Sequence, residues 1–288
     1  MARMNPWKVA LLRAGFRARL AVSEAWAFRV AHRLFTTPRR HPAPAEERGG
    51  MGGARRVELA FEGGRIAAWV WGDSGPRVVL LHGWEGRSSQ WHRVAARLRG
   101  RGFQVFAVDP PAHGSSLGWR RANLPLFSRT LLRLETEFGA FACAVGHSMG
   151  GAAIVRALAL GFAPGRAVIV SAPSRPKDYW TQMLVALGLP AGRIPAFDRR
   201  FERAYSFRWE EMDLAVRARE RGEEVLFIHD RQDKEVAFRE AEGMAAAWRG
   251  ARLLPTEGLG HRRILADPAV AEAIADFAGA AEGPGQAA

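Results

Sequence analysis

The chain of 288 residues has one cysteine, three lysines and two tyrosines. The single Cys143 excludes an internal disulfide and any paired-cysteine metal or redox motif. No apolar run reaches the roughly 18 residues of a membrane span. Arg13, Arg17 and Arg19 also interrupt any apolar core of a signal peptide. We therefore expect a globular protein of the cytoplasm.

Positive charge is carried almost entirely by arginine and is spread unevenly. Lys and Arg total 42 against 29 acids, for a net charge of +13. Such a balance suits a nucleic-acid or membrane-surface partner. Residues 3–40 hold nine cations and one acid, Glu24, which accounts for +8 of the total. Because no nucleic-acid-binding motif accompanies this charge, we expect no nucleic-acid partner.

Residues 1–40 are expected to form a basic helical arm. Apolar residues recur in it at spacings of three, four or seven, which predicts a stripe along one helix or two successive helices. These residues are Val9, Leu12, Phe16, Leu20, Ala27, Val30 and Leu34. Two interpretations stay open: the stripe packs on the main domain, or residues 3–40 form a basic amphipathic surface that touches an anionic membrane.

The rest of the chain divides by composition into a linker and one domain. Residues 41–56 are dominated by proline, glycine and charge, which is typical of a linker. Residues 57–282 alternate strand and helix signals, and this pattern predicts a doubly wound, mostly parallel α/β sheet. Residues 174–222 interrupt the alternation with apolar side chains at helical spacing. We expect this insertion to form a helical cap over one edge of the sheet.

A candidate nucleophile lies in the sequence GHSMG. Ser148 follows the apolar run FACAV and precedes the helical run GAAIVRALAL. In this context a sharp strand-to-helix turn lifts a serine hydroxyl clear of the sheet. Small residues on both sides suit a backbone that is strained and closely packed.

The partners that a serine nucleophile needs follow in the expected chain order, which is serine, acid, histidine. EVLFIHDRQDKEV offers Asp230 and Asp233 after a predicted strand, and GLGHRRIL offers His261. An oxyanion also needs two backbone N–H donors. We assign these to Met149, which follows the serine, and to Trp84 in the loop after RVVLLHG.

Together these motifs resemble the α/β-hydrolase fold superfamily over about residues 57–280. The stretches that carry the likeness, in the family's order, are HGW, DPPAHGSS, GHSMGG, HDRQDKEV and GLGHRRIL. The resemblance implies a small helical cap on the sheet, in addition to the helical N-terminal arm. It selects Asp233 as the acid, with Asp230 standing where the family commonly has glycine. It also implies structural roles for Asp109 and His113.

The mechanism implied by the resemblance is acyl transfer to water. His261 takes the proton of Ser148, Asp233 holds the imidazole, and no metal or organic cofactor is required. Apolar residues of the cap predict a pocket for an apolar acyl or aromatic group. These pocket residues are Trp180, Met183, Leu184 and Trp209.

The sequence favours a small-molecule carboxylic ester as substrate. Hydrolysis of a thioester or of a carbon–carbon bond is the alternative on the same triad. The surplus of arginine suits a thioester whose carrier has an anionic group such as phosphate. Two further hypotheses are a non-catalytic member that binds a ligand and a lipid-surface protein whose arm carries the main function. The sequence leaves the oligomeric state open.

Overall fold

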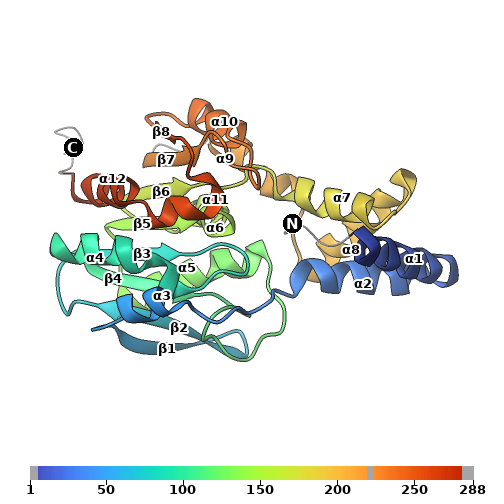
Figure 1. Cartoon of the computed structure of the whole chain (residues 1–288), viewed down its shortest axis with the longest axis horizontal. Helices are drawn as coiled ribbons and strands as arrows, with labels where there is room; N and C mark the ends of the chain where they lie inside the picture. The colour runs from blue at the N-terminus through green and yellow to red at the C-terminus, as the bar shows by residue number, and fades with distance from the viewer. Residues whose placement is uncertain (1–5, 219–222, 281–288) are drawn as a thin grey trace.

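A mixed, mostly parallel sheet forms the centre of the protein (Figure 1). The computed structural model describes residues 6–218 and 223–280. Within these residues the sheet has eight strands in the order β1-β2-β4-β3-β5-β6-β7-β8. Their bounds are β1 (Arg55–Phe61), β2 (Gly64–Trp71), β3 (Arg77–Leu81), β4 (Gln104–Asp109), β5 (Cys143–His147), β6 (Arg166–Val170), β7 (Glu224–Asp230) and β8 (Arg252–Thr256). β2 pairs antiparallel with β1 and β4, and the other pairs are parallel. The predicted fold class is confirmed.

Helices cover both faces of this sheet because the central strands are apolar on both sides. In β3, Val78 and Leu80 pack into one buried cluster, and Val79 and Leu81 pack into the other. The first cluster includes α4 (His92–Gly100) and α12 (Pro268–Gly279). The second includes α5 (Leu124–Phe138), α6 (Met149–Ala159) and α10 (Arg239–Ala247). A continuous apolar run is what a strand covered on both faces requires.

Strand register brings the loops of the candidate site to one edge of the sheet. Leu81 of β3 lies opposite Gly146 of β5, and His147 of β5 lies opposite Val170 of β6. The carboxyl ends of these parallel strands therefore lie side by side, where ligands of open α/β sheets collect. Short elements follow the strands at this edge: η1 (Ser88–Trp91), α11 (Gly260–Arg263) and η4 (Ile264–Ala266).

Four helices form a lobe beyond this edge, at the right of Figure 1. This helical lobe consists of α1 (Pro6–Val22), α2 (Glu24–Thr36), α7 (Pro176–Ala186) and α8 (Ile194–Tyr205). α1 and α2 belong to the predicted arm, and α7 and α8 to the predicted cap. η2 (Ala191–Arg193), η3 (Trp209–Met212) and α9 (Leu214–Ala218) complete the described part of the cap. The helical arm and cap of the predicted fold class are both present.

The apolar stripe of the arm lies on two helices rather than one. Ser23 ends the first helix, and its side chain caps α2 by accepting the N–H of Trp26 at 3.3 Å. Phe16 and Ala27 of the stripe are buried, whereas Leu12 and Leu34 are exposed. The stripe therefore packs on the cap only in part. The side chain of Val9 lies outside the described part of the chain.

The predicted linker holds a short helix, α3 (Ala45–Gly50), and β1 begins within it at Arg55. Glu47 of α3 binds the guanidinium of Arg87 through two contacts of 2.7 Å. This pair ties the segment to the loop after β3. The division into arm, linker and domain stays a prediction. Parts of it, namely residues 1–5, 219–222 and 281–282, lie outside the described residues.

Candidate active site

Ser148 occupies a strained turn between β5 and α6. Its φ of 52° is positive, a backbone conformation that costs a non-glycine residue on the order of 1–3 kcal/mol. The surrounding packing holds this turn. The Ser148 N–H donates to the carbonyl of Val170 at 2.8 Å. A Cβ on Gly146 would lie 2.6 Å from the Gly150 carbonyl, and one on Gly150 would lie 2.1 Å from that of Leu81. The glycines of the motif are thus required by close backbone contact.

The loop after β3 lies directly against this serine. A Cβ on Gly83 would come within 2.7 Å of the Ser148 Cβ, so only glycine lets the loop approach this closely. Trp84 follows Gly83, and Met149 is the first residue of α6. Trp84 and Met149 are thus the chain neighbours of the two residues in close approach, and their assignment as oxyanion donors stays a prediction.

Asp233 and His261 meet at the same edge of the sheet. The Nδ1–H of His261 donates to Asp233 Oδ2 at 2.7 Å. Asp233 Oδ1 accepts the N–H groups of Glu235 and Val236 at 2.8 and 3.0 Å. Burial alone would raise the pKa of Asp233, but its contacts with His229 and His261 hold that pKa well below the ordinary value. The carboxylate is therefore ionised and fixes the proton of His261 on Nδ1, which leaves Nε2 available as a base.

His147 connects the serine turn to the His261 loop. Its Nε2–H donates to the backbone carbonyl of His261 at 2.8 Å, and the two rings lie 4.7 Å apart. Burial, with a further contribution from His261, lowers the pKa of His147 to about 3. The ring is therefore neutral near pH 7. The sequence analysis assigned it no role, and its place next to the nucleophile in GHSMGG was the signal available.

His229 is a second histidine beside Asp233. It is fully buried, and its Nε2 lies 2.9 Å from the Val236 carbonyl and 3.4 Å from Asp233 Oδ2. It therefore lies near the same carboxylate oxygen that His261 contacts. Sequence reasoning assigned no role to this residue either.

Asp230 holds the loop of the histidine rather than its ring. The carboxylate is fully buried. It accepts the N–H of Gln232 at 3.0 Å, and the Thr256 hydroxyl and the N–H of Leu259 at 2.9 Å. Burial would raise the pKa of Asp230, but backbone N–H groups led by that of Leu259 hold it below the ordinary value. Of the two candidate acids, Asp233 is the one in contact with the His261 ring.

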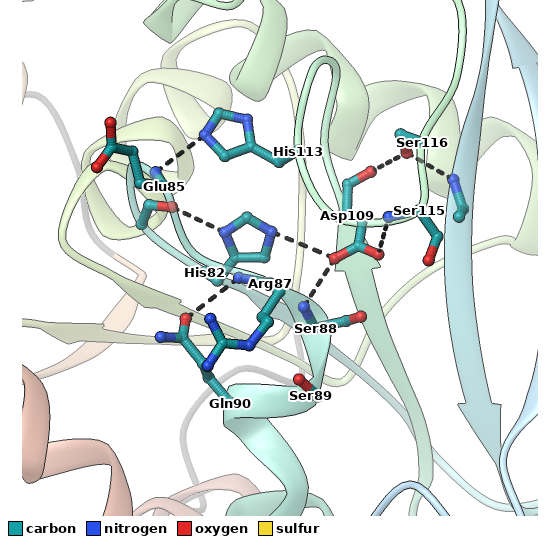
Figure 2. A network of polar contacts seen from close by, with 12 residues as sticks. His82, Glu85, Arg87, Ser88, Ser89, Gln90, Asp109, His113, Ser115 and Ser116 are labelled. Atoms are coloured by element: carbon teal, nitrogen blue, oxygen red, sulfur yellow. Dashed lines mark hydrogen bonds and ion pairs between the residues drawn. The ribbon is translucent and has the colours of Figure 1, made fainter. Parts of the chain in front are cut away.

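A buried polar network supports the loop that carries Trp84 (Figure 2). Asp109 accepts the N–H groups of Ser88 and Ser115 at 2.7 and 2.8 Å, and His82 Nε2 lies 3.4 Å from the same carboxylate. Burial would raise the pKa of Asp109, but these contacts, His82 first, hold it below the ordinary value. The carboxylate thus joins the loops after β3 and β4.

His113 adds a second support to the same loop. Its Nε2 accepts the N–H of Glu85 at 3.1 Å, so its proton is on Nδ1, which donates to the Pro111 carbonyl at 3.0 Å. Burial and the neighbouring His82 lower the pKa of His113 to about 3. The neutral ring therefore has one fixed tautomer. These contacts of Asp109 and His113 with backbone groups are structural, as the resemblance implied.

The end of the arm also reaches this loop, which the sequence analysis did not predict. Arg39 contacts both carboxylate oxygens of Glu85, at 3.0 and 3.1 Å. Arg40 donates to the carbonyls of Ala112 and Ser116 at 3.1 and 2.8 Å. The arm is thus fastened to both loops that support the candidate oxyanion site.

The residues predicted to line the pocket lie in the cap. Trp180, Met183, Leu184 and Trp209 are all buried in the packed core that includes the lobe. The Trp180 indole donates to Asp198 at 3.0 Å, and its ring lies 4.8 Å from that of Phe201. Trp209 stacks on Phe201 at 5.2 Å. All four side chains are therefore held in this packing, and their role in lining a substrate pocket stays a prediction.

An open cavity of about 370 Å³ lies beside His261. It is lined by Gln232, Lys234, Glu235, Gly258, Leu259, Gly260, His261, Arg262 and Arg263. Three of these side chains are cationic, and Glu235 is bound to Arg262 at 3.1 Å. In the part of the chain that the structure describes, no three His, Cys, Asp or Glu side chains converge in an arrangement that could hold a metal ion.

Comparisons with known proteins identify the family to which the chain belongs. The alpha/beta hydrolase family pattern matches residues 78–275. An esterase of Mycobacterium tuberculosis is 37% identical over 120 residues, which are 40% of this chain and 39% of that protein. A monoacylglycerol lipase of Mycolicibacterium smegmatis is 34% identical over 161 residues, 50% of this chain and 56% of that protein. These alignments span less than two thirds of either relative.

A solved structure shows the same fold. The esterase RhEst1 from Rhodococcus sp. ECU1013 aligns with a TM-score of 0.58 and 22% identity, covering 78% of this chain and 98% of that chain. The family pattern covers more than half of the sequence, and the serine, acid and histidine motifs lie at one edge of the sheet. The chain therefore belongs to the alpha/beta hydrolase family.

Proposed function

We propose that the protein hydrolyses a carboxylic ester through an acyl-enzyme on Ser148. The observation that carries the proposal is the 2.7 Å bond between His261 Nδ1 and Asp233 Oδ2, since His147, the neighbour of Ser148 in its strained turn, contacts the backbone of the same histidine. His261 Nε2 removes the Ser148 proton, and the serine oxygen attacks the ester carbonyl carbon. His261 then protonates the departing alcohol. Water clears the acyl-enzyme with the same base.

The amides of Trp84 and Met149 are proposed to stabilise the oxyanion. Removal of one such donor from a serine hydrolase typically costs about 10²–10³-fold in rate. The side chains of Trp84 and Met149 are half-buried beside the serine. They offer partly exposed apolar surface to the acyl group, in addition to the pocket residues predicted in the cap. This supports an ester with an apolar acyl chain as substrate.

A thioester with an anionic handle is the second candidate. It is favoured by the cations of the cavity beside His261, where Lys234, Arg262 and Arg263 are exposed. A phosphate-bearing leaving group would be attracted to the cations of this cavity. A carbon–carbon bond as substrate stays a hypothesis from the sequence.

The test is an acyl chain-length series offered both as neutral p-nitrophenyl esters and as coenzyme A thioesters. We expect hydrolysis by the wild-type protein and at least about a 10³-fold lower kcat for Ser148→Ala. Equal rates for the two proteins would refute the mechanism.

Lys234→Ala with Arg263→Ala distinguishes the two substrate classes. If the cations of the cavity bind the phosphate groups of coenzyme A, the KM of the double variant rises about tenfold for thioesters and stays unchanged for the neutral esters. If the wild type and the double variant have the same KM for thioesters as well as for neutral esters, only the ester remains supported as substrate.

A further inference from the structure

Helix α1 is apolar on two opposite sides, and only one of them is covered. Phe16 is 1% exposed and its ring lies 6.5 Å from that of Phe197 in α8. Successive helical residues turn by about 100°, which places another set on the opposite side at spacings of three and four. This set, here called the outer face of α1, is Leu11, Ala14, Ala18 and Val22. All four are exposed, with Leu11 at 67% and Val22 at 77%.

Exposed apolar side chains are concentrated on the arm. Six of the ten large apolar residues that are exposed in the described part of the chain belong to α1 and α2. They are Trp7, Leu11, Leu12, Val22, Trp26 and Leu34. A concentration of this kind on a folded surface marks a site of contact with a partner or a membrane.

The exposed cations of the arm lack acidic partners. Arg17 of α1 and Arg29 and Arg33 of α2 are exposed, and among the described residues none of them forms an ion pair with a carboxylate. The only acid in residues 3–40 is Glu24. Arg193 and Arg200 of the cap bind it at 3.7 and 3.3 Å. The surface of the arm therefore presents positive charge without compensation.

Arg19 joins the two helices of the arm into one surface. Its guanidinium lies 5.0 Å from the centre of the Trp26 ring, and it donates to the Gly15 carbonyl at 2.8 Å. Trp26 shares the outward side of α2 with Arg29 and Arg33, which lie three and seven residues further on. Apolar side chains of α1 thus continue into a tryptophan flanked by arginine.

We propose that the outer face of α1 docks on an anionic membrane surface. A helix that lies in the plane of a membrane buries its apolar side in the interface and keeps arginine at the headgroups. The negative surface potential of anionic lipids attracts cations that lie close to the membrane. A second copy of the chain fits this surface less well, because it would bring two positively charged arms together. No helix among the described residues has the length and apolar character to cross the bilayer.

This docking differs from the one that the sequence suggested. The stripe predicted from spacing includes Phe16 and Ala27, which the lobe already buries. The outer face lies on the other side of α1, so the arm packs on the cap and still has a face for lipid. The inference is independent of the hydrolytic chemistry, since Ser148→Ala is expected to bind membranes like the wild-type protein.

Vesicle co-sedimentation of the full-length protein tests the proposal. The probes are vesicles of equal parts phosphatidylglycerol and phosphatidylcholine, and vesicles of phosphatidylcholine alone. We expect at least about tenfold tighter binding to the anionic vesicles, weakened by salt. Leu11→Asp with Val22→Asp should lower that binding at least tenfold. The matched control is Leu117→Asp with Leu160→Asp, which changes two exposed leucines outside the arm and should bind like wild type.

Two double variants that reverse charge separate electrostatic attraction to the lipid from apolar contact with it. Arg29→Glu with Arg33→Glu should remove the preference for anionic vesicles, whereas Arg99→Glu with Arg120→Glu, the same change in net charge elsewhere, should retain most of it. Light scattering reports the oligomeric state of each variant in parallel. Equal vesicle binding by wild type and Leu11→Asp/Val22→Asp would overturn the proposal. The proposal would also be overturned if the wild-type protein is a dimer that does not bind vesicles and if the same variant is a monomer. A second copy of the chain would then cover the outer face.

Discussion

Replacing Asp233 by asparagine tests the arrangement of the triad most sharply. Asp233 Oδ1 accepts the N–H groups of Glu235 and Val236, and Oδ2 accepts the Nδ1–H of His261. In the variant, the amide oxygen must take the place of Oδ1 to satisfy the two backbone donors. The NH₂ group then points at His261 Nδ1, which has to become an acceptor. The proton of His261 moves to Nε2, and the base toward Ser148 is lost.

The size of this effect follows from the tautomer. A triad with the wrong histidine tautomer loses roughly 10⁴-fold in kcat, which corresponds to about 5 kcal/mol of transition-state stabilisation. The fold should survive, because the amide is nearly isosteric and keeps the backbone contacts. Asp230→Asn is the matched control. Asp230 contacts Thr256 and Leu259 instead of the His261 ring, so its loss should cost about 1–3 kcal/mol of stability and much less activity.

The assay is kcat on a short-chain ester, with circular dichroism to confirm that both variants are folded. We expect the Asp233 variant to fall by about 10⁴-fold and folded Asp230→Asn by less than about tenfold. Activity of the Asp233 variant above a tenth of wild type would refute the assignment. A folded but inactive Asp230→Asn beside an active Asp233→Asn would transfer the role of the acid to Asp230.

Three further predictions follow from the site and its supports. Gly83→Ala places a Cβ 2.7 Å from that of Ser148, so kcat/KM should fall about 10²-fold. The control is Gly243→Ala, whose Cβ meets open space and should leave kcat/KM unchanged. Equal kinetics for the two variants would contradict the close approach of the loop to the serine. Burial lowers the pKa of His113 to about 3 in the folded protein, whereas the pKa is near 6.5 in the unfolded chain. Between these two pH values the unfolded state therefore binds more protons than the folded state. The free energy of unfolding should therefore drop as pH falls from about 6.5 toward 3, by up to about 1.4 kcal/mol per unit, and urea unfolding of His113→Gln should show a shallower pH slope. Trp180→Phe removes a buried hydrogen bond and should lower the free energy of unfolding by about 1–2 kcal/mol. KM should stay unchanged if the side chain only packs, whereas a selective rise in KM would support its predicted role in the substrate pocket.

Local patterns predicted the sheet and the tight turn of the candidate serine because each depends on neighbours in the sequence. The apolar run of β3 and the small residues around Ser148 indicate a buried strand and a tight turn without knowledge of the remaining chain. Family resemblance selected Asp233 over Asp230, and the contact with His261 agrees with that choice.

Contacts between distant segments were not predictable in the same way. Trp180 carries the same apolar signal whether it lines a pocket or packs on the arm, and only the position of α2 and α8 decides between the two. Arg39 is one of many arginines in the sequence, and its contact with Glu85 spans 46 positions. The arm could be predicted as helical, but which side of α1 the cap would leave exposed depends on how the two fold together.

Covalent labelling with a fluorophosphonate tests the central claim most directly. The folded protein is treated with the reagent, and the modified peptide is located by mass spectrometry. Nucleophilic activation by His261 predicts a single adduct on Ser148, abolished in Ser148→Ala and strongly slowed in Asp233→Asn. Failure of the folded wild-type protein to react, or equal labelling of Ser148→Ala, would contradict the proposal that this serine is the nucleophile.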